Sequence, residues 1–105
     1  MLRNKVEKIT VYIPTAQCDD SRYSVPEAIR TLSWIVGGVT KVPSIGGWLN
    51  GTKWVEEPVT LHVWLVQPMQ EMAFRPALAR LCSELLTAGE STVLVEYASV
   101  EMELV

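Results

Sequence analysis

Residues 37–64 constrain the fold more than any other part of the chain. They hold five of the six glycines, three of the four tryptophans and the single histidine. Asn50-Gly51 lies in their middle and is the strongest short-range signal for a β-hairpin, because a type I′ turn needs a positive φ at both central residues. We therefore predict a two-residue turn at Asn50-Gly51. The register that follows places the indole of Trp54 opposite Gly47, where it can cover exposed backbone.

Hydrophobic periodicity predicts the other elements on either side of this hairpin. The first helix has start and stop signals, because Ser24 and Glu27 match a capping box and Gly37 can form a left-handed C-cap. The expected order is a strand over 6–14, a helix over 25–36, the hairpin, a helix over about 76–87 that residues 69–74 could extend, and a strand over 91–97, with 100–104 as a possible extra C-terminal strand.

This order of elements is that of a ferredoxin-like βαββαβ fold, in the α+β class. The right-handed crossover rule places the first and third strands side by side in the centre of an antiparallel sheet. Both helices then cover one face of the sheet, and we call the other face its open face. A chain of 105 residues, 49% of them hydrophobic, suffices for one core, so we expect a single domain over residues 1–105.

Alternation along the two central strands predicts which side chains the open face carries. In the first strand, Ile9, Val11 and Ile13 are predicted to face the helices. Thr10 and Tyr12 then lie on the open face. In the second arm of the hairpin, the apolar residues Val59, Leu61, Val63 and Leu65 are predicted to face the helices. The residues then predicted on the open face are Thr60, His62 and Trp64 and, if Pro58 causes no bulge, Trp54 and Glu56.

Composition weighs against several classes of partner. The formal charge of −3 and the absence of a basic cluster disfavour a nucleic-acid backbone or an anionic membrane surface. No apolar run reaches the roughly 18 residues that a membrane span needs. The first residues, Met1 to Lys8, contain no apolar signal-peptide segment, so we expect a cytoplasmic protein.

Metal, cofactor and disulfide chemistry are not expected either. Cys18 and Cys82 are isolated in the sequence, and without a secretion signal a disulfide between them is not favoured. One histidine without a Cys-x-x-Cys pair does not make a zinc site. The sequence has no phosphate-loop, dinucleotide-binding or nucleophile-elbow motif, and we expect no cofactor.

Four short motifs are spread over most of the chain: Gly37-Gly38-x-Thr40, Gly47-Trp48, Glu57 before a strand, and Glu90-Ser91-x-Val93-Leu94-Val95. Their combination resembles small uncharacterised bacterial and phage proteins of similar length. The resemblance implies a ferredoxin-like fold, and it carries no catalytic residues to transfer.

The predicted open face carries aromatic rings and an imidazole, so something should cover it. Two helices can cover only one face of a four-stranded sheet, and two-fold pairing is the commonest way to cover the other. We therefore favour a non-enzymatic binding or accessory protein that forms a homodimer or a higher homo-oligomer. Its open face could also hold a small-molecule or protein ligand.

Two alternatives stay open. A cofactor-independent enzyme, built like the dimeric α/β barrels, would use His62 as its acid or base, with Glu56 in the same pocket. RNA binding is a remote alternative: Tyr12 and Trp64 lie where an RNA-recognition motif stacks bases, but the ribonucleoprotein consensus is absent and the net charge is negative. The candidate site residues are Thr10, Tyr12, Trp54, Thr60, His62 and Trp64.

Overall fold

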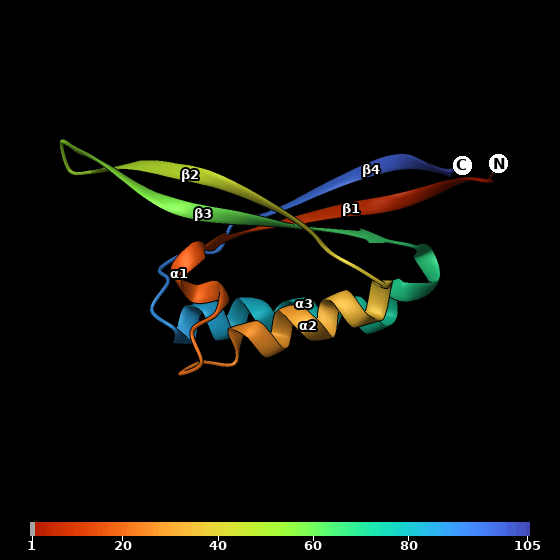
Figure 1. Cartoon of the computed structure of the whole chain (residues 1–105), viewed down its shortest axis with the longest axis horizontal. Helices are drawn as coiled ribbons and strands as arrows, with labels where there is room; N and C mark the ends of the chain where they lie inside the picture. Colours follow the sequence, from red (N-terminus) through yellow and green to blue (C-terminus); the bar gives the residue numbers. More distant parts are fainter. Residues whose placement is uncertain (1) are drawn as a thin grey trace.

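The computed structural model describes residues 2–105. Its elements are β1 (Leu2–Pro14), α1 (Thr15–Cys18), α2 (Val25–Val36), β2 (Thr40–Asn50), β3 (Lys53–Val66), the 3-10 helix η1 (Pro68–Gln70), α3 (Glu71–Thr87) and β4 (Val95–Leu104). The four strands form an antiparallel sheet in the order β2-β3-β1-β4, and α2 and α3 lie against one face of it (Figure 1). The predicted ferredoxin-like α+β fold, with β1 and β3 in the centre, is confirmed.

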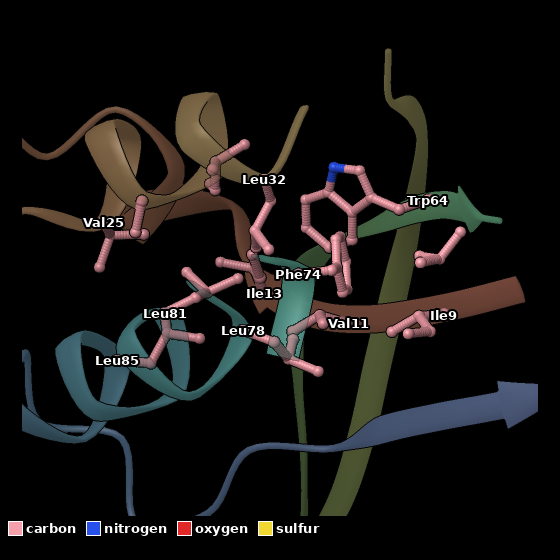
Figure 2. Packing of buried hydrophobic residues seen from close by; sticks show 13 residues of the cluster. Ile9, Val11, Ile13, Val25, Leu32, Trp64, Phe74, Leu78, Leu81 and Leu85 are labelled. Carbon is pink, nitrogen blue, oxygen red and sulfur yellow. The ribbon is translucent and has the colours of Figure 1, made fainter. Parts of the chain in front are cut away.

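The core lies between the sheet and the two long helices (Figure 2). Ile9, Val11 and Ile13 of β1 are buried there, as predicted. Each helix buries a stripe of residues at three- and four-residue spacing, which lies on one face of a helix. The stripes are Val25, Ala28, Ile29 and Leu32 in α2, and Phe74, Leu78, Leu81 and Leu85 in α3.

The face of β3 that packs against the helices is the one that was predicted to lie on the open face of the sheet. Ile9 pairs with Trp64 and Val11 pairs with His62. Residues directly opposite each other in an antiparallel pair share a face. Trp64 and His62 therefore point into the core, where the exposure of each is 0%. The predicted orientation is wrong, and the residues that lie on the open face instead are Val59, Leu61, Val63 and Leu65.

We call the choice of which alternate side chains of β3 face the helices the phase of this strand. Hydrophobicity does not decide the phase, because β3 is apolar on both faces. The environment of Trp64 decides it. The indole Nε1–H of Trp64 donates a hydrogen bond to Ser33 Oγ of α2 at 3.1 Å. Its ring also packs edge-on against Phe74 of α3, with 6.0 Å between the ring centroids. A buried indole needs a partner for its N–H, and only the helix side offers Ser33.

The two long helices differ from the prediction at their N-termini. Helix α2 begins at Val25 as expected, but the predicted capping box is wrong, because Ser24 makes no side-chain cap hydrogen bond. The backbone N–H of Ala28 bonds instead to the carbonyl of Ser24 at 3.0 Å. Helix α3 begins at Glu71 and contains Pro76, so residues before Pro76 do extend it. The buried ring of Phe74 lies in this extension and holds it against the core.

The hairpin turn is shifted by one residue from the prediction. Asn50 pairs with Lys53, so the central residues of the turn are Gly51 and Thr52. Gly51 has φ 66°, and no residue other than glycine has a positive φ in the described part of the chain. A positive φ at the first central residue alone fits a type II′ turn and not the predicted type I′ turn.

Trp54 covers the backbone of Gly47 although the two residues are not directly opposite. Gly47 pairs with Glu56, and Leu49 pairs with Trp54. A Cβ atom on Gly47 would overlap the benzene ring of Trp54, which shows that the indole lies directly over this glycine. The predicted contact is therefore present as a diagonal contact.

The hairpin extends past the end of the helical layer, which gives the molecule an elongated shape (Figure 1). The principal extents are 50 × 27 × 18 Å and the radius of gyration is 14.8 Å. A compact domain of this length has a radius of gyration of about 13 Å. Almost every residue of β2 is exposed, so the hairpin depends on very little packing from the rest of the chain.

Strand β4 takes up residues that the sequence assigned to two segments. It begins at Val95, later than the predicted strand over 91–97. Residues 100–104, predicted as a possible extra strand, are in strand conformation as the second half of β4 and pair with β1.

Replacing Gly51 by alanine should lower the free energy of unfolding by about 1 kcal/mol or more, because an L-residue is strained at positive φ. Gly38→Ala is the matched control, since its φ is not in the positive region and a Cβ atom there would meet nothing within 4 Å. That control should leave stability unchanged or raise it slightly. Urea denaturation of both variants tests the turn, and equal effects would contradict it.

Candidate functional site

The structure divides the predicted site residues between the two sides of the sheet. Thr10 and Tyr12 lie on the open face, as predicted, although Thr10 is already buried by its own chain. The reversed phase of β3 removes the other four residues from this face, so the predicted set does not form one surface. The residues on the helix side are Thr60, His62 and Trp64, with Trp54 on the same side of β3 farther along the hairpin.

His62 is enclosed in the core and cannot meet an external ligand. Its ring stacks on Trp64 with 5.9 Å between the centroids, and its Nδ1 lies 3.2 Å from the carbonyl oxygen of Thr60. Its Nε2 has no hydrogen-bond partner in the described part of the chain. Burial lowers the pKa of this imidazole below its usual value of 6.5, and the positive charge of Lys41 lowers it further.

Glu56 is the other residue of the enzyme hypothesis, and it lies apart from His62. Its carboxylate is exposed on the hairpin, where Oε2 accepts a hydrogen bond from Nε1 of Trp54 at 3.1 Å. One side chain is solvated and the other is sealed in the core, so an acid–base pair of His62 and Glu56 is not formed.

A cleft of about 540 Å³ lies on the open face, near the point where β1 ends and the hairpin begins to project. Small-molecule sites occupy roughly 300–1,000 Å³, so this cleft is of suitable size. Three adjacent strands form its floor, and the segment that links α3 to β4 lines one side. The floor residues are Tyr12, Pro14, Ser44, Ile45, Gly46, Gly47, Trp48, Glu57, Val59 and Leu61, and the side residues are Glu90, Ser91, Thr92 and Leu94.

Gly46 keeps the floor of the cleft low. A Cβ atom at this position would lie 2.8 Å from Cγ2 of Val59, so any side chain would force the valine to move. The next residue, Gly47, faces the other side of the sheet, where the Trp54 ring covers it. The backbone at Gly46-Gly47 therefore has no side chains over it in the cleft, whereas the Trp54 ring covers it on the opposite face of the sheet.

The charged groups that line the cleft all have the same sign. Glu57 and Glu90 contribute carboxylates, whereas no lysine, arginine or histidine is among the lining residues. Hydroxyl groups come from Ser44 on the floor and from Ser91 and Thr92 at the side. This arrangement can accept and donate hydrogen bonds, and it favours positive over negative charge.

Tyr12 is held in place by Glu96 across the boundary between β1 and β4. Its phenol O–H donates a hydrogen bond to Oε1 of Glu96. This hydrogen bond is the main cause that raises the pKa of Tyr12 above its usual value of 10.0, and burial and the charge of Glu96 act in the same direction. Tyr12 is therefore a neutral phenol at physiological pH, with its ring at the edge of the cleft.

Metal ligands and reactive thiols do not add to this site. Within residues 2–105, no group of three histidine, cysteine, aspartate or glutamate side chains is placed to hold a metal ion. Cys18 and Cys82 are half-buried free thiols that pack against the core, and burial is the main cause that raises the pKa of each. Over the same residues, the helices are too short or too polar to cross a membrane.

Most residues of the cleft were not among the predicted site residues. Glu57 and Glu90 belong to the short motifs noted in the sequence, and Trp48 follows the glycine pair, so each was visible as a feature. What the sequence could not show is that the segment after α3 passes beside Tyr12, whose backbone N–H bonds to the carbonyl of Leu94 at 3.2 Å. This contact joins residues about eighty positions apart.

Sequence comparison and fold comparison give different results for this chain. No family model and no curated protein sequence matches it. The fold, however, matches that of CPII, a nitrogen regulatory PII-like protein from Thiomonas intermedia K12 solved with ADP, AMP and bicarbonate. The two are 10% identical with a TM-score of 0.62, and the match covers 98% of each chain.

Two further solved structures are similar. CutA from Synechococcus elongatus PCC7942 is 9% identical with a TM-score of 0.62, over 93% of this chain and 80% of that chain. A phage SAM lyase, solved in complex with S-methyl-5′-thioadenosine, is 11% identical with a TM-score of 0.53, over 94% of this chain and 90% of that chain. At such low identity these matches show a shared fold.

The burial of His62 predicts how stability depends on pH. The unfolded chain protonates this imidazole below about pH 6.5, whereas the folded state, with its lowered pKa, resists protonation. The unfolded state therefore binds more protons in this range, and stability falls as the pH decreases from about 7.5 to about 5.

Urea denaturation at these two pH values measures the effect, with His62→Leu as the comparison. The carboxylates titrate alike in both proteins, so the wild type should lose more stability on acidification than the variant does. An equal loss in both proteins would show that His62 does not titrate differently in the folded state.

Proposed function

We propose that this protein forms a homo-oligomer through its open face and binds a small ligand, built on adenosine, in the cleft on that face. The observation that carries the proposal is the position of the cleft, which lies on a sheet face that is apolar and uncovered by the chain's own helices. A second copy laid over this face would shield the apolar side chains and close the cleft from above.

The open face has the composition of a surface that is covered in the assembled protein. Val42 is 42% exposed, Leu65 is 40% exposed and Trp48 is 43% exposed. Leu61, Val63 and Val100 are half-buried on the same face. Contiguous apolar surface of this kind marks an interaction site more often than a free surface.

The projecting hairpin supports the same conclusion. It carries apolar side chains on both faces, with Ile45, Leu49 and Trp54 on one and Val42 and Trp48 on the other. A two-stranded hairpin without packing is marginally stable in water. Contact with another subunit would supply the packing that α2 and α3 do not reach far enough to provide.

The ligand class follows from the fold likeness together with the cleft. CPII was solved with ADP and AMP, and the phage SAM lyase with S-methyl-5′-thioadenosine, so two proteins with this fold bind compounds that contain adenosine. In the present chain, the ring of Trp48 offers a surface on which a base can stack. The hydroxyls of Ser44, Ser91 and Thr92 can bond to a ribose.

Self-association can be tested by changing Leu65 to glutamate. The new carboxylate would lie opposite Lys8, so it should be tolerated in the monomer while it disrupts an apolar interface. Sedimentation at high micromolar concentration should show an oligomer for the wild type and a smaller species for Leu65→Glu. Leu86→Glu, on the exposed side of α3, should sediment like the wild type. A monomeric wild type would refute the proposed assembly.

Ligand binding can be tested by filling the cleft with a tryptophan. Ser44→Trp places an indole on the floor, and Thr40→Trp places one on the same face of β2 outside the cleft. Calorimetric titration with S-methyl-5′-thioadenosine and S-adenosylmethionine should give binding to the wild type and to Thr40→Trp. Ser44→Trp should weaken binding by roughly tenfold or more, or about 1.4 kcal/mol. Equal affinities for both variants would place the ligand elsewhere.

A further inference from the structure

We infer that the ligand of the cleft carries a positive charge and no phosphate group. The inference rests on the proposed function, because it concerns the same cleft. It concerns charge alone, and it follows from the side chains that surround the space.

The two carboxylates at the cleft have few partners of their own. Glu57 is half-buried and makes neither a salt bridge nor a side-chain hydrogen bond within the described residues. Glu90 accepts one long hydrogen bond, from Nε2 of Gln17 at 3.5 Å. Neither negative charge is neutralised by a neighbouring cation, so both are available to a ligand.

The cations of the open face lie outside the cleft. Lys8 is opposite Leu65 and Ala98, and Lys53 is at the hairpin turn opposite Asn50. Phosphate binding needs arginine or lysine side chains, or a helix N-terminus, directed at the anion. The cleft offers none of these, because its floor is sheet and its lining contains no basic residue. A nucleotide phosphate placed here would meet two carboxylates without compensation.

The aromatic residues of the cleft act in the same direction as the carboxylates. The face of an indole or phenol ring is the negative end of its quadrupole and attracts cations. Trp48 and Tyr12 both line the cleft, and the Tyr12 hydroxyl is engaged with Glu96, which adds a further negative charge next to the site. Enclosure by a second subunit would exclude water and strengthen each of these attractions.

Two probes that differ at one sulfur atom test the charge preference. S-adenosylmethionine has a positively charged sulfonium, and S-adenosylhomocysteine has a neutral thioether in the same place. Calorimetric titration of the wild type should give at least tenfold tighter binding of the sulfonium compound, and AMP should bind more weakly than either. Equal affinity for the two sulfur compounds, or tighter binding of AMP, would overturn the inference.

Adjacent glutamates on opposite faces of β3 provide the matched variants. Glu57→Gln should reduce the preference for the sulfonium compound by about tenfold. Glu56→Gln makes the same change of net charge on the other side of the sheet and should leave the preference as in the wild type. If both variants behave alike, the preference comes from overall charge, and the assignment to the cleft is wrong.

A second measurement separates failure of this inference from failure of the proposed ligand class. Amide chemical shifts of the cleft residues should move on addition of tetramethylammonium and not on addition of inorganic phosphate. If no adenosine compound binds but tetramethylammonium does, the charge inference stands and the adenosine ligand is wrong. If phosphate shifts these residues, or if neither ion does, the charge inference is overturned.

Discussion

The burial of one indole ring determines which side chains of β3 lie on the open face of this sheet. Trp64 fills the space between β3 and the two helices, where it bonds to Ser33 of α2 and packs on Phe74 of α3. Side chains of a strand alternate between its two faces, so the burial of Trp64 in the core determines the face on which each of the remaining side chains of β3 lies. The central strand then carries Leu61, Val63 and Leu65 on its outer side, and the open face becomes apolar.

The site follows from this same alternation. Glu57, Val59 and Leu61 share a face because they are two residues apart, and Gly46 and Ser44 lie beside them on β2. Had β3 packed with the other phase, Glu56 and His62 would have reached the open face, but six residues of extended strand would have held them roughly 20 Å apart, too far for an acid–base pair. With the observed phase, the polar groups at the cleft are carboxylates and hydroxyls, which suit binding and charge selection.

The sequence was sufficient for the fold and for little of the site. The order of elements, the central pair of strands and the start and end of α2 were predicted, because periodicity and Gly37 are local signals. The phase of β3 was not predicted, since both of its faces are apolar and the deciding contact of Trp64 is to a distant helix.

The turn was misplaced by one residue because Gly51 can serve in either turn. This error slides the pairing of the two arms by two residues, so the same residues of β2 and β3 still share a face. The cleft needed the tertiary contact between Tyr12 and Leu94, which no local pattern records.

The pairing of β1 with β4 sets an order of events during synthesis. β1 is made first, and one of its edges is filled only when β4, the last element, has emerged and pairs along it from Val11 to Leu2. Until then the nascent chain presents an unpaired strand edge, which can pair with another nascent chain that is being made on the same messenger RNA. β1 carries the charged residues Lys5, Glu7 and Lys8. Charged side chains on an exposed strand edge are one way in which natural sheets prevent pairing with another chain. β1 lies in the centre of the folded sheet, yet it has the charged side chains that are typical of an edge strand.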